Sequence, residues 1–216
     1  MRVKTTISFL IAALFLGLFI WGLTNVSYIY LLAAFIVIAL FLYNATRLLG
    51  RLHPEKEQRL MKSYLIVMFV FYLFFLFQLT FNVNRTHFML IFQNKELLRA
   101  YLKRNINLIP FKSIIEPFKG GFTISYILVN IFGNIAALAP MGFFLPRLFR
   151  PARKLLPFTL ITSLVVVFIE FTQFLFTVGS VDIDDLILNV AGAVIVFLFL
   201  EIPTIKRTVD KIILRE

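Results

Sequence analysis

The sequence has no cysteine among its 216 residues and only two histidines. Disulfide bonds and thiolate metal sites are therefore excluded, and cysteine use says nothing about the redox state of the compartment. His53 and His87 stand alone in polar segments, without the spacing of metal ligands. Signatures of serine hydrolases, zinc peptidases and phosphate-binding glycine loops are missing as well. We therefore expect no metal ion and no cofactor.

Acidic residues are also scarce, with 11 against 22 basic ones and a net charge of +11. The basic residues lie between long apolar segments and do not alternate with aromatic residues. This distribution is typical of loops that face an anionic membrane surface, and it does not indicate a nucleic-acid-binding face. We expect membrane lipids as partners and no nucleic acid.

Apolar residues are abundant in the chain. They make up 60% of it, including 27 Phe, whereas a soluble domain rarely exceeds about 50%. Six segments reach the length of about 20 apolar residues that a membrane-spanning helix needs. They cover roughly residues 7–23, 27–43, 63–83, 124–145, 155–178 and 185–202. The sequence therefore predicts an all-α polytopic membrane protein with six transmembrane helices.

The basic residues predict the orientation of these helices. With a cytoplasmic N-terminus, 15 of the 22 Lys and Arg fall in inner segments and seven in the outer segment 84–123. The positive-inside rule then places both termini in the cytoplasm. Because no cleavage site of small residues follows the first apolar run, we expect it to be kept as a helix.

The outer segment 84–123 has features of its own. Residues 95–104 repeat apolar side chains at helical spacing between basic ones, which predicts a helix lying in the membrane interface. Pro110 favours an extended turn after it. We divide the chain into a scaffold of three helices, residues 1–83, and a second part, residues 84–216, that holds the site.

Three of the predicted spans each carry a polar stripe. The side chains recur three, four or seven residues apart, on one helix face: Asn130 and Asn134; Glu170 and Gln173; Asp185, Asn189 and Gly192. Burying the three stripes together is the least costly arrangement in lipid. At about 1.5 Å of rise per residue, all of them fall in the outer half of the bilayer. We therefore expect a polar pocket open to the outside, with the acidic turn 182–185 above it.

Other roles are open for each polar group. Asn and Gln in membrane helices often serve only as interhelical hydrogen bonders, worth about 1 kcal/mol each. Glu170 can be a proton carrier, a general acid or base, or a strut. At least one acid of the turn 182–185 should cap the last helix, and the others could bind a divalent cation. Pro140 should kink the fourth span just below Asn134.

These residues resemble motifs of the VanZ-like family of bacterial membrane proteins. The matching pieces appear in the family's order: Asn107 and Pro110; Asn130, Asn134, Pro140 and Gly142; Glu170 and Gln173; Asp182, Asp185, Asn189 and Gly192. The resemblance implies a multi-pass protein of the bacterial plasma membrane, linked in Gram-positive bacteria to resistance against glycopeptides, above all teicoplanin.

We interpret the chain as a protein that binds an outer-leaflet lipid or a lipid-linked precursor of the cell envelope. The predicted acid–base residues are Glu170 and Asp185. The predicted binding residues are Asn107, Asn130, Asn134, Gln173, Asp182 and Asn189. Two alternatives use the same site: an intramembrane enzyme that modifies a lipid head group, and a proton-coupled lipid transporter or flippase component that relies on Glu170.

Overall fold

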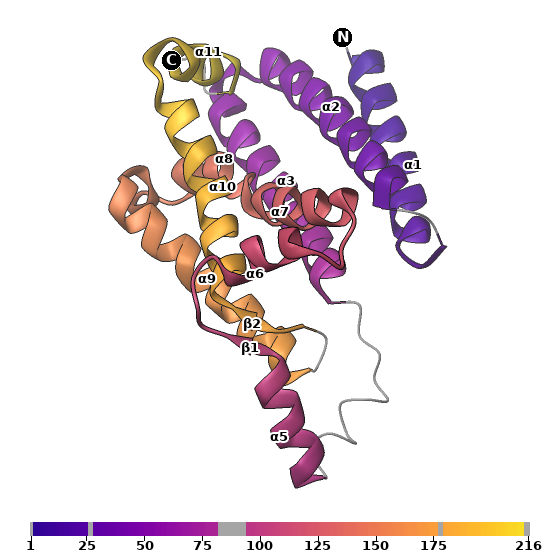
Figure 1. The fold of residues 1–216 in the computed structure, drawn as a ribbon. Helices are drawn as coiled ribbons and strands as arrows, with labels where there is room; N and C mark the ends of the chain where they lie inside the picture. The colour runs from indigo at the N-terminus through magenta and orange to yellow at the C-terminus, as the bar shows by residue number, and fades with distance from the viewer. Residues whose placement is uncertain (1, 26–27, 82–93, 177–178, 214–216) are drawn as a thin grey trace. The chain divides into compact units, whose positions relative to one another are not determined.

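A computed structural model describes residues 2–25, 28–81, 94–176 and 179–213 (Figure 1). The chain forms two compact units, the first made of Met1–Leu79 and Lys206–Glu216 and the second of Thr80–Ile205. The predicted boundary after residue 83 lies outside the described residues. The structure also assigns the end of the chain to the first unit, whereas the predicted division placed it in the second.

The first unit is built on a helical hairpin. Helix α1 (Arg2–Asn25) packs along α2 (Tyr28–Leu52), and η1 (Pro54–Lys56) leads into α3 (Glu57–Thr80). Ile38 is 1% exposed and is surrounded by apolar side chains that include Phe15, Phe71 and Phe75. Burying this much aromatic and aliphatic surface holds the helices together.

The second unit contains four helices that position the site. They are α7 (Ile124–Leu138), α8 (Met141–Leu148), α9 (Leu155–Leu175) and α10 (Ile183–Glu201), and α10 packs against the other three. A Cβ atom at Gly192 would overlap the carbonyl oxygen of Ile135 in α7. At Gly142 it would lie 2.5 Å from the carbonyl oxygen of Ala193. Glycine at these two points therefore lets α10 approach α7 and α8 closely.

The predicted fourth span is divided at Pro140. Helix α7 ends at Leu138 and α8 begins at Met141. Proline has no backbone N–H, so it cannot continue the hydrogen-bond ladder of α7. Its carbonyl oxygen instead accepts from the backbone N–H groups of Phe143 and Phe144, both at 3.0 Å, and starts α8. The expected irregularity below Asn134 is present.

Within the part of the chain that the structure describes, five helical stretches are long and apolar enough to cross a membrane. They are Leu32–Leu52, Pro54–Thr80, Ile124–Leu148, Leu155–Leu175 and Ile183–Glu201. Large apolar side chains such as Leu164 and Phe168 stay about 70% exposed, as expected of helices that face lipid. The all-α polytopic fold is confirmed. The first predicted span forms most of α1, whose described side chains provide a shorter apolar stretch, Val3–Gly17.

The segment before α7 confirms the predicted short helix and adds a feature that was not expected. Helix α5 covers Lys95–Arg104, and α6 (Lys112–Ile115) and η2 (Glu116–Lys119) follow it. Between α5 and α6, strand β1 (Ile106–Asn107) pairs in parallel with β2 (Val181–Asp182), which directly precedes α10 (Figure 1). This short pairing holds the loop against the N-terminus of α10.

The last helix, α11, covers Pro203–Ile213. Its residues from Lys206 onward belong to the first unit, where the backbone carbonyl of Ile212 accepts a hydrogen bond of 3.1 Å from the Tyr43 hydroxyl. The C-terminal segment is thus tied to α2.

Candidate functional site

The site is organised around the acidic turn that begins α10. The Asp182 side chain accepts a hydrogen bond of 2.9 Å from the backbone N–H of Asp184 and so caps the helix. An acidic cap satisfies a free backbone donor and suits the positive end of the helix dipole. The prediction that one acid of this turn is a helix cap is confirmed.

The loop between α5 and α7 supplies further donors to Asp182. The Asn107 amide donates to Oδ1 of Asp182 at 3.0 Å and to the Ser113 hydroxyl oxygen at 2.9 Å, while that hydroxyl donates to Oδ2 of Asp182. Residues about 70 positions apart in the sequence are joined in this way. Both oxygens of the buried Asp182 carboxylate are satisfied, as buried charges require.

Asp184 is bound by main-chain groups of the same loop. Its side chain is 1% exposed, and it accepts from the backbone N–H groups of Phe111 and, at 2.7 Å, Ser113. Phe111 has a φ of 64°, a left-handed conformation that is uncommon for a residue with a Cβ atom. This turn after Pro110 aims both N–H groups at the carboxylate.

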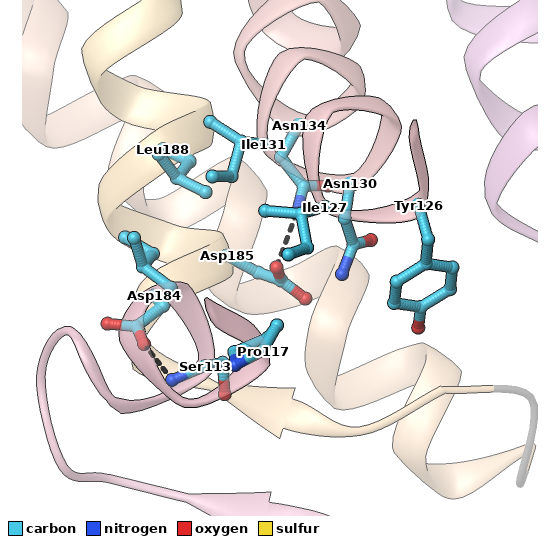
Figure 2. Close-up of a pocket in the computed structure, with 11 residues that line it drawn as sticks. Ser113, Pro117, Tyr126, Ile127, Asn130, Ile131, Asn134, Asp184, Asp185 and Leu188 are labelled. Carbon is cyan, nitrogen blue, oxygen red and sulfur yellow. Dashed lines mark hydrogen bonds between the residues drawn. The ribbon is translucent and has the colours of Figure 1, made fainter. Parts of the chain in front are cut away.

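Asp185 differs from its two neighbours because it is only partly satisfied. The Asn134 amide of α7 donates to its Oδ1 atom, and Oδ2 has no hydrogen-bond partner among the described residues. In Figure 2 the carboxylate lies between α7 and the loop that carries Ser113 and Pro117. Asp185 is therefore the acid of the turn that remains able to bind something else.

Asp185 lines a pocket that encloses about 320 Å³ of space, its open mouth included. Two helices and the loop form its walls: Tyr126, Ile127, Asn130, Ile131 and Asn134 come from α7, Asp184, Asp185 and Leu188 from α10, and Ser113, Ile114 and Pro117 from the loop (Figure 2). A few polar groups thus converge within an apolar frame, which is the usual composition of a ligand pocket.

Glu170 is not among the residues that line this pocket. Its side chain is 7% exposed, and Oε1 has no hydrogen-bond partner among the described residues. The Asp185 and Asp182 carboxyls and the backbone N–H of Asp182 are its polar neighbours. Glu170 and Asp185 are therefore neighbours, and only Asp185 lines the pocket.

Four of the six predicted binding residues do not line the pocket: Asn107, Gln173, Asp182 and Asn189. The Gln173 amide donates to the backbone carbonyl of Thr80 at 2.9 Å, and the Asn189 amide donates to the backbone carbonyl of Asp185 at 2.8 Å. Neither side chain lines the pocket. Asn130 does line it and is exposed. Of the polar stripe on α10, Asp185 faces the pocket, while Gly192 provides the close contact with α7.

The sequence analysis missed three residues with contacts in or near the site: Ser113, Tyr126 and Tyr101. Ser113 bonds two polar side chains of the site, and Tyr126 lines the pocket beside Asn130. Tyr101 lies in α5, and its hydroxyl shares its single hydrogen between the backbone carbonyls of Phe174 (3.2 Å) and Gly179 (2.9 Å). Ser113 carried a usable signal, because a hydroxyl three residues after Pro110 marks a turn able to face an acidic cluster.

No group of three or more His, Asp or Glu side chains within the part of the chain that the structure describes is arranged to hold a metal ion. Asp182 and Asp184 already receive hydrogen bonds on both of their oxygens. The idea of a divalent cation at the acidic turn therefore receives no support from the geometry.

Comparison with known protein families gives one match. A sequence model of the VanZ/LLP1 family matches residues 63–203, which include most of α3 and every residue of the candidate site. The chain belongs to the VanZ/LLP1 family. Comparisons with curated proteins and with solved structures gave no match. Membership of the VanZ/LLP1 family and the five long apolar helices together identify a membrane-embedded protein.

Proposed function

We propose that this VanZ/LLP1 protein binds an outer-leaflet lipid or a lipid-linked cell-wall component in the plasma membrane of a Gram-positive bacterium. Through that binding it lowers susceptibility to glycopeptide antibiotics such as teicoplanin. The ligand enters the pocket between α7, α10 and the loop that carries Ser113. Helices α9 and α10 and the hydrogen-bonded loop hold the walls in place.

The observation that carries this proposal is the incomplete hydrogen bonding of the Asp185 carboxylate. Asn134 fixes one of its oxygens, and the other has no partner among the described residues although it borders a pocket. A carboxylate away from bulk water is costly unless it is paired. A residue needed only for structure would be saturated with donors, as Asp182 and Asp184 are.

The surroundings of the pocket support a lipid as the ligand. The loop between α5 and α7 exposes large apolar side chains, among them Leu108, Ile109 and Phe118, each more than 60% exposed. Apolar side chains next to exposed lysines are typical of segments that lie in a membrane interface. A pocket walled by such a loop opens at the level of lipid head groups.

Antibiotic susceptibility tests the proposal directly. In a susceptible Gram-positive host where expression of the wild type raises the inhibitory concentration of teicoplanin, Asp185→Asn should abolish the increase. Glu116→Gln removes one negative charge from the same loop at an exposed residue outside the pocket, so it should keep the increase. Immunoblots of membranes must show equal protein amounts. Full protection by Asp185→Asn would rule out the pocket as the functional site.

Whether the pocket opens to the outside of the cell can be tested separately by cysteine labelling, because the chain has no native cysteine. Single cysteines are introduced at two exposed basic residues, Lys103 in α5 and Arg59 in α3. In intact cells a membrane-impermeant maleimide should label Lys103→Cys and not Arg59→Cys. After the cells are opened, both should be labelled. The reverse pattern would place the pocket on the cytoplasmic side and contradict the proposal.

An enzyme acting on a lipid head group is the second candidate, and the proximity of Glu170 to Asp185 favours it. Two neighbouring carboxyls, one of them buried, are a common arrangement for general acid–base chemistry. In that case Asp185 would contact the substrate and Glu170 would act through Asp185. Conversion of labelled envelope lipids by the purified protein, lost in Asp185→Asn, would identify an enzyme; retention of unchanged lipid would identify a binder.

A further inference from the structure

The pocket offers acceptors and carries no positive charge of its own. Its described lining includes two carboxylates, those of Asp184 and Asp185, and neither Lys nor Arg. The Asp185 Oδ2 atom, the Asn130 amide and the Tyr126 hydroxyl have no side-chain hydrogen-bond partner among the described residues. In Figure 2 the Asn130 amide and the Asp185 carboxylate border the same space, with Tyr126 at its edge.

Glu170, a buried acid that does not line the pocket, adds to this excess of acceptors. Glu170 is more than nine-tenths buried, its Oε1 atom has no partner among the described residues, and it lies beside Asp185. Placing two carboxyls together in an apolar environment is unfavourable unless a cation or a proton compensates them. A cationic group of a ligand, bound at Asp185, would supply that compensation.

Positive charge lies just outside the pocket. Lys112 directly precedes the lining residue Ser113, and Lys119 follows the lining residue Pro117 by two positions. Both lysines are exposed, and neither forms an ion pair within the described part of the chain. Exposed ammonium groups at a membrane surface attract phosphate. Acceptors thus line the pocket, and the two exposed lysines belong to the loop segment that forms one of its walls.

We infer that the ligand is a zwitterionic lipid head group in which a primary ammonium is joined to a phosphate. This inference rests on the proposed lipid-binding function and specifies its ligand. The ammonium enters the pocket and donates to Asp185 and Asn130, and Tyr126 provides a third oxygen. The phosphate stays near Lys112 and Lys119. A primary ammonium has three N–H donors for these acceptors, whereas a quaternary ammonium has none.

The experiment measures head-group preference with the purified full chain in detergent. Native mass spectrometry is used to titrate it with phosphatidylethanolamine, phosphatidylcholine and phosphatidylglycerol that carry the same acyl chains. Glycerophosphoethanolamine, which has the same head group and no acyl chain, distinguishes a lipid from a soluble phosphate ester. We expect phosphatidylethanolamine to bind at least about ten-fold more tightly than the other two lipids, and glycerophosphoethanolamine only weakly.

Substitutions connect the preference to the pocket. Asp185→Asn should reduce the affinity for phosphatidylethanolamine about ten-fold and leave that for phosphatidylglycerol unchanged. Glu116→Gln, the charge-matched control, should change neither affinity. Because Asp185 also anchors Asn134, the exposed residue Asn130 provides a second variant that does not endanger the fold. Asn130→Leu should weaken the binding of phosphatidylethanolamine several-fold.

The outcomes separate this inference from the proposed function. Equal binding of all three lipids, weakened equally by Asn130→Leu, would overturn the ammonium preference while the pocket remains a lipid site. Tighter binding of glycerophosphoethanolamine than of the lipid would overturn the assignment to a lipid head group. If no lipid binds wild type, the proposed lipid-binding function itself is overturned.

Discussion

The two units of the chain differ in the kind of polar side chain that they bury. Among the described side chains of the first unit, the buried polar residues are Thr5 and Ser8, both neutral hydroxyls. In the second unit they include three carboxyls: Glu170, Asp182 and Asp184. Buried carboxyls cost far more than buried hydroxyls. The difference indicates that apolar packing dominates the first unit, whereas the second unit also needs specific hydrogen bonds to satisfy its buried carboxyls.

The largest expected effect comes from the close contact of α10 with α7. Gly192→Leu places a side chain where the carbonyl of Ile135 lies, and this should lower the free energy of unfolding by about 3 kcal/mol or more. Gly17→Leu in α1 is the matched control, since a Cβ atom there meets nothing within 4 Å. Thermal unfolding of both proteins in detergent measures the difference. Equal losses would mean that the second unit is not the more tightly constrained one.

The next effect concerns the buried acid that holds the loop. Asp184→Ala leaves the backbone N–H groups of Phe111 and Ser113 without an acceptor, so it should cost about 3 kcal/mol. In the first unit, Asn44→Ala removes one partly buried hydrogen bond, to Ser8, and should cost about 1 kcal/mol. Limited proteolysis should cleave the loop 106–122 faster in Asp184→Ala alone. An uncleaved loop would contradict the role given to Asp184.

A smaller effect is expected at Tyr101. Tyr101→Phe removes the shared hydrogen bond that ties α5 to the carbonyls of Phe174 and Gly179, at a cost of about 1–2 kcal/mol. Amide hydrogen exchange in α5 should accelerate while that in α10 stays the same. Tyr30→Phe, at an exposed residue of α2, should leave exchange unchanged throughout. Faster exchange across the entire second unit would mean that α5 is not locally attached.

Tyr101 should also make the free energy of unfolding depend on pH. Burial raises the pKa of the Tyr101 phenol above its usual value of 10. The neutral phenol is therefore favoured in the folded state, and its contribution to stability is complete below about pH 10 and is lost as the pH rises through the folded-state pKa. Above about pH 10, the stability difference between wild type and Tyr101→Phe should shrink as the pH rises further. A constant difference would contradict this cause.

The smallest effect is expected at an ion pair of the first unit. Arg47 and Glu57 are joined at 3.2 Å, with side chains 20% and 18% exposed. Partly exposed pairs of this kind contribute little, so Glu57→Gln should lower the unfolding free energy by less than about 1 kcal/mol. Chemical denaturation measures it. A loss as large as that of Asp184→Ala would erase the distinction between the two units.

The sequence was most informative about features that depend on a single helix, such as its length, its break and the face on which a side chain lies. Apolar length predicted the spans, Pro140 predicted the break in the fourth, and spacing placed Asn130 and Asn134 on the face that lines the pocket. These are local properties. The sequence also indicated that the polar stripes of neighbouring helices meet, but it did not indicate that Asn134 pairs with Asp185.

The loop could not be predicted in the same way. Asp184 is bound by the backbone N–H groups of Phe111 and Ser113, and backbone donors leave no mark in the residue types of a sequence. The two-residue pairing of β1 with β2 is too short for a period to show. Gln173 bonds the carbonyl of Thr80, a partner that helical spacing alone does not reveal.

The pairing of β1 with β2 also determines when the site can come into existence. Asn107, Ser113 and Asn134 are synthesised well before Asp182, Asp184 and Asp185, and α10 follows α5, α7 and α9 along the chain. Before α10 is present, the earlier residues lack the carboxylates that they hydrogen-bond. A chain that stops before residue 181 has α5, α7 and α9 but lacks the α10 residues that line the pocket, so it cannot form the pocket.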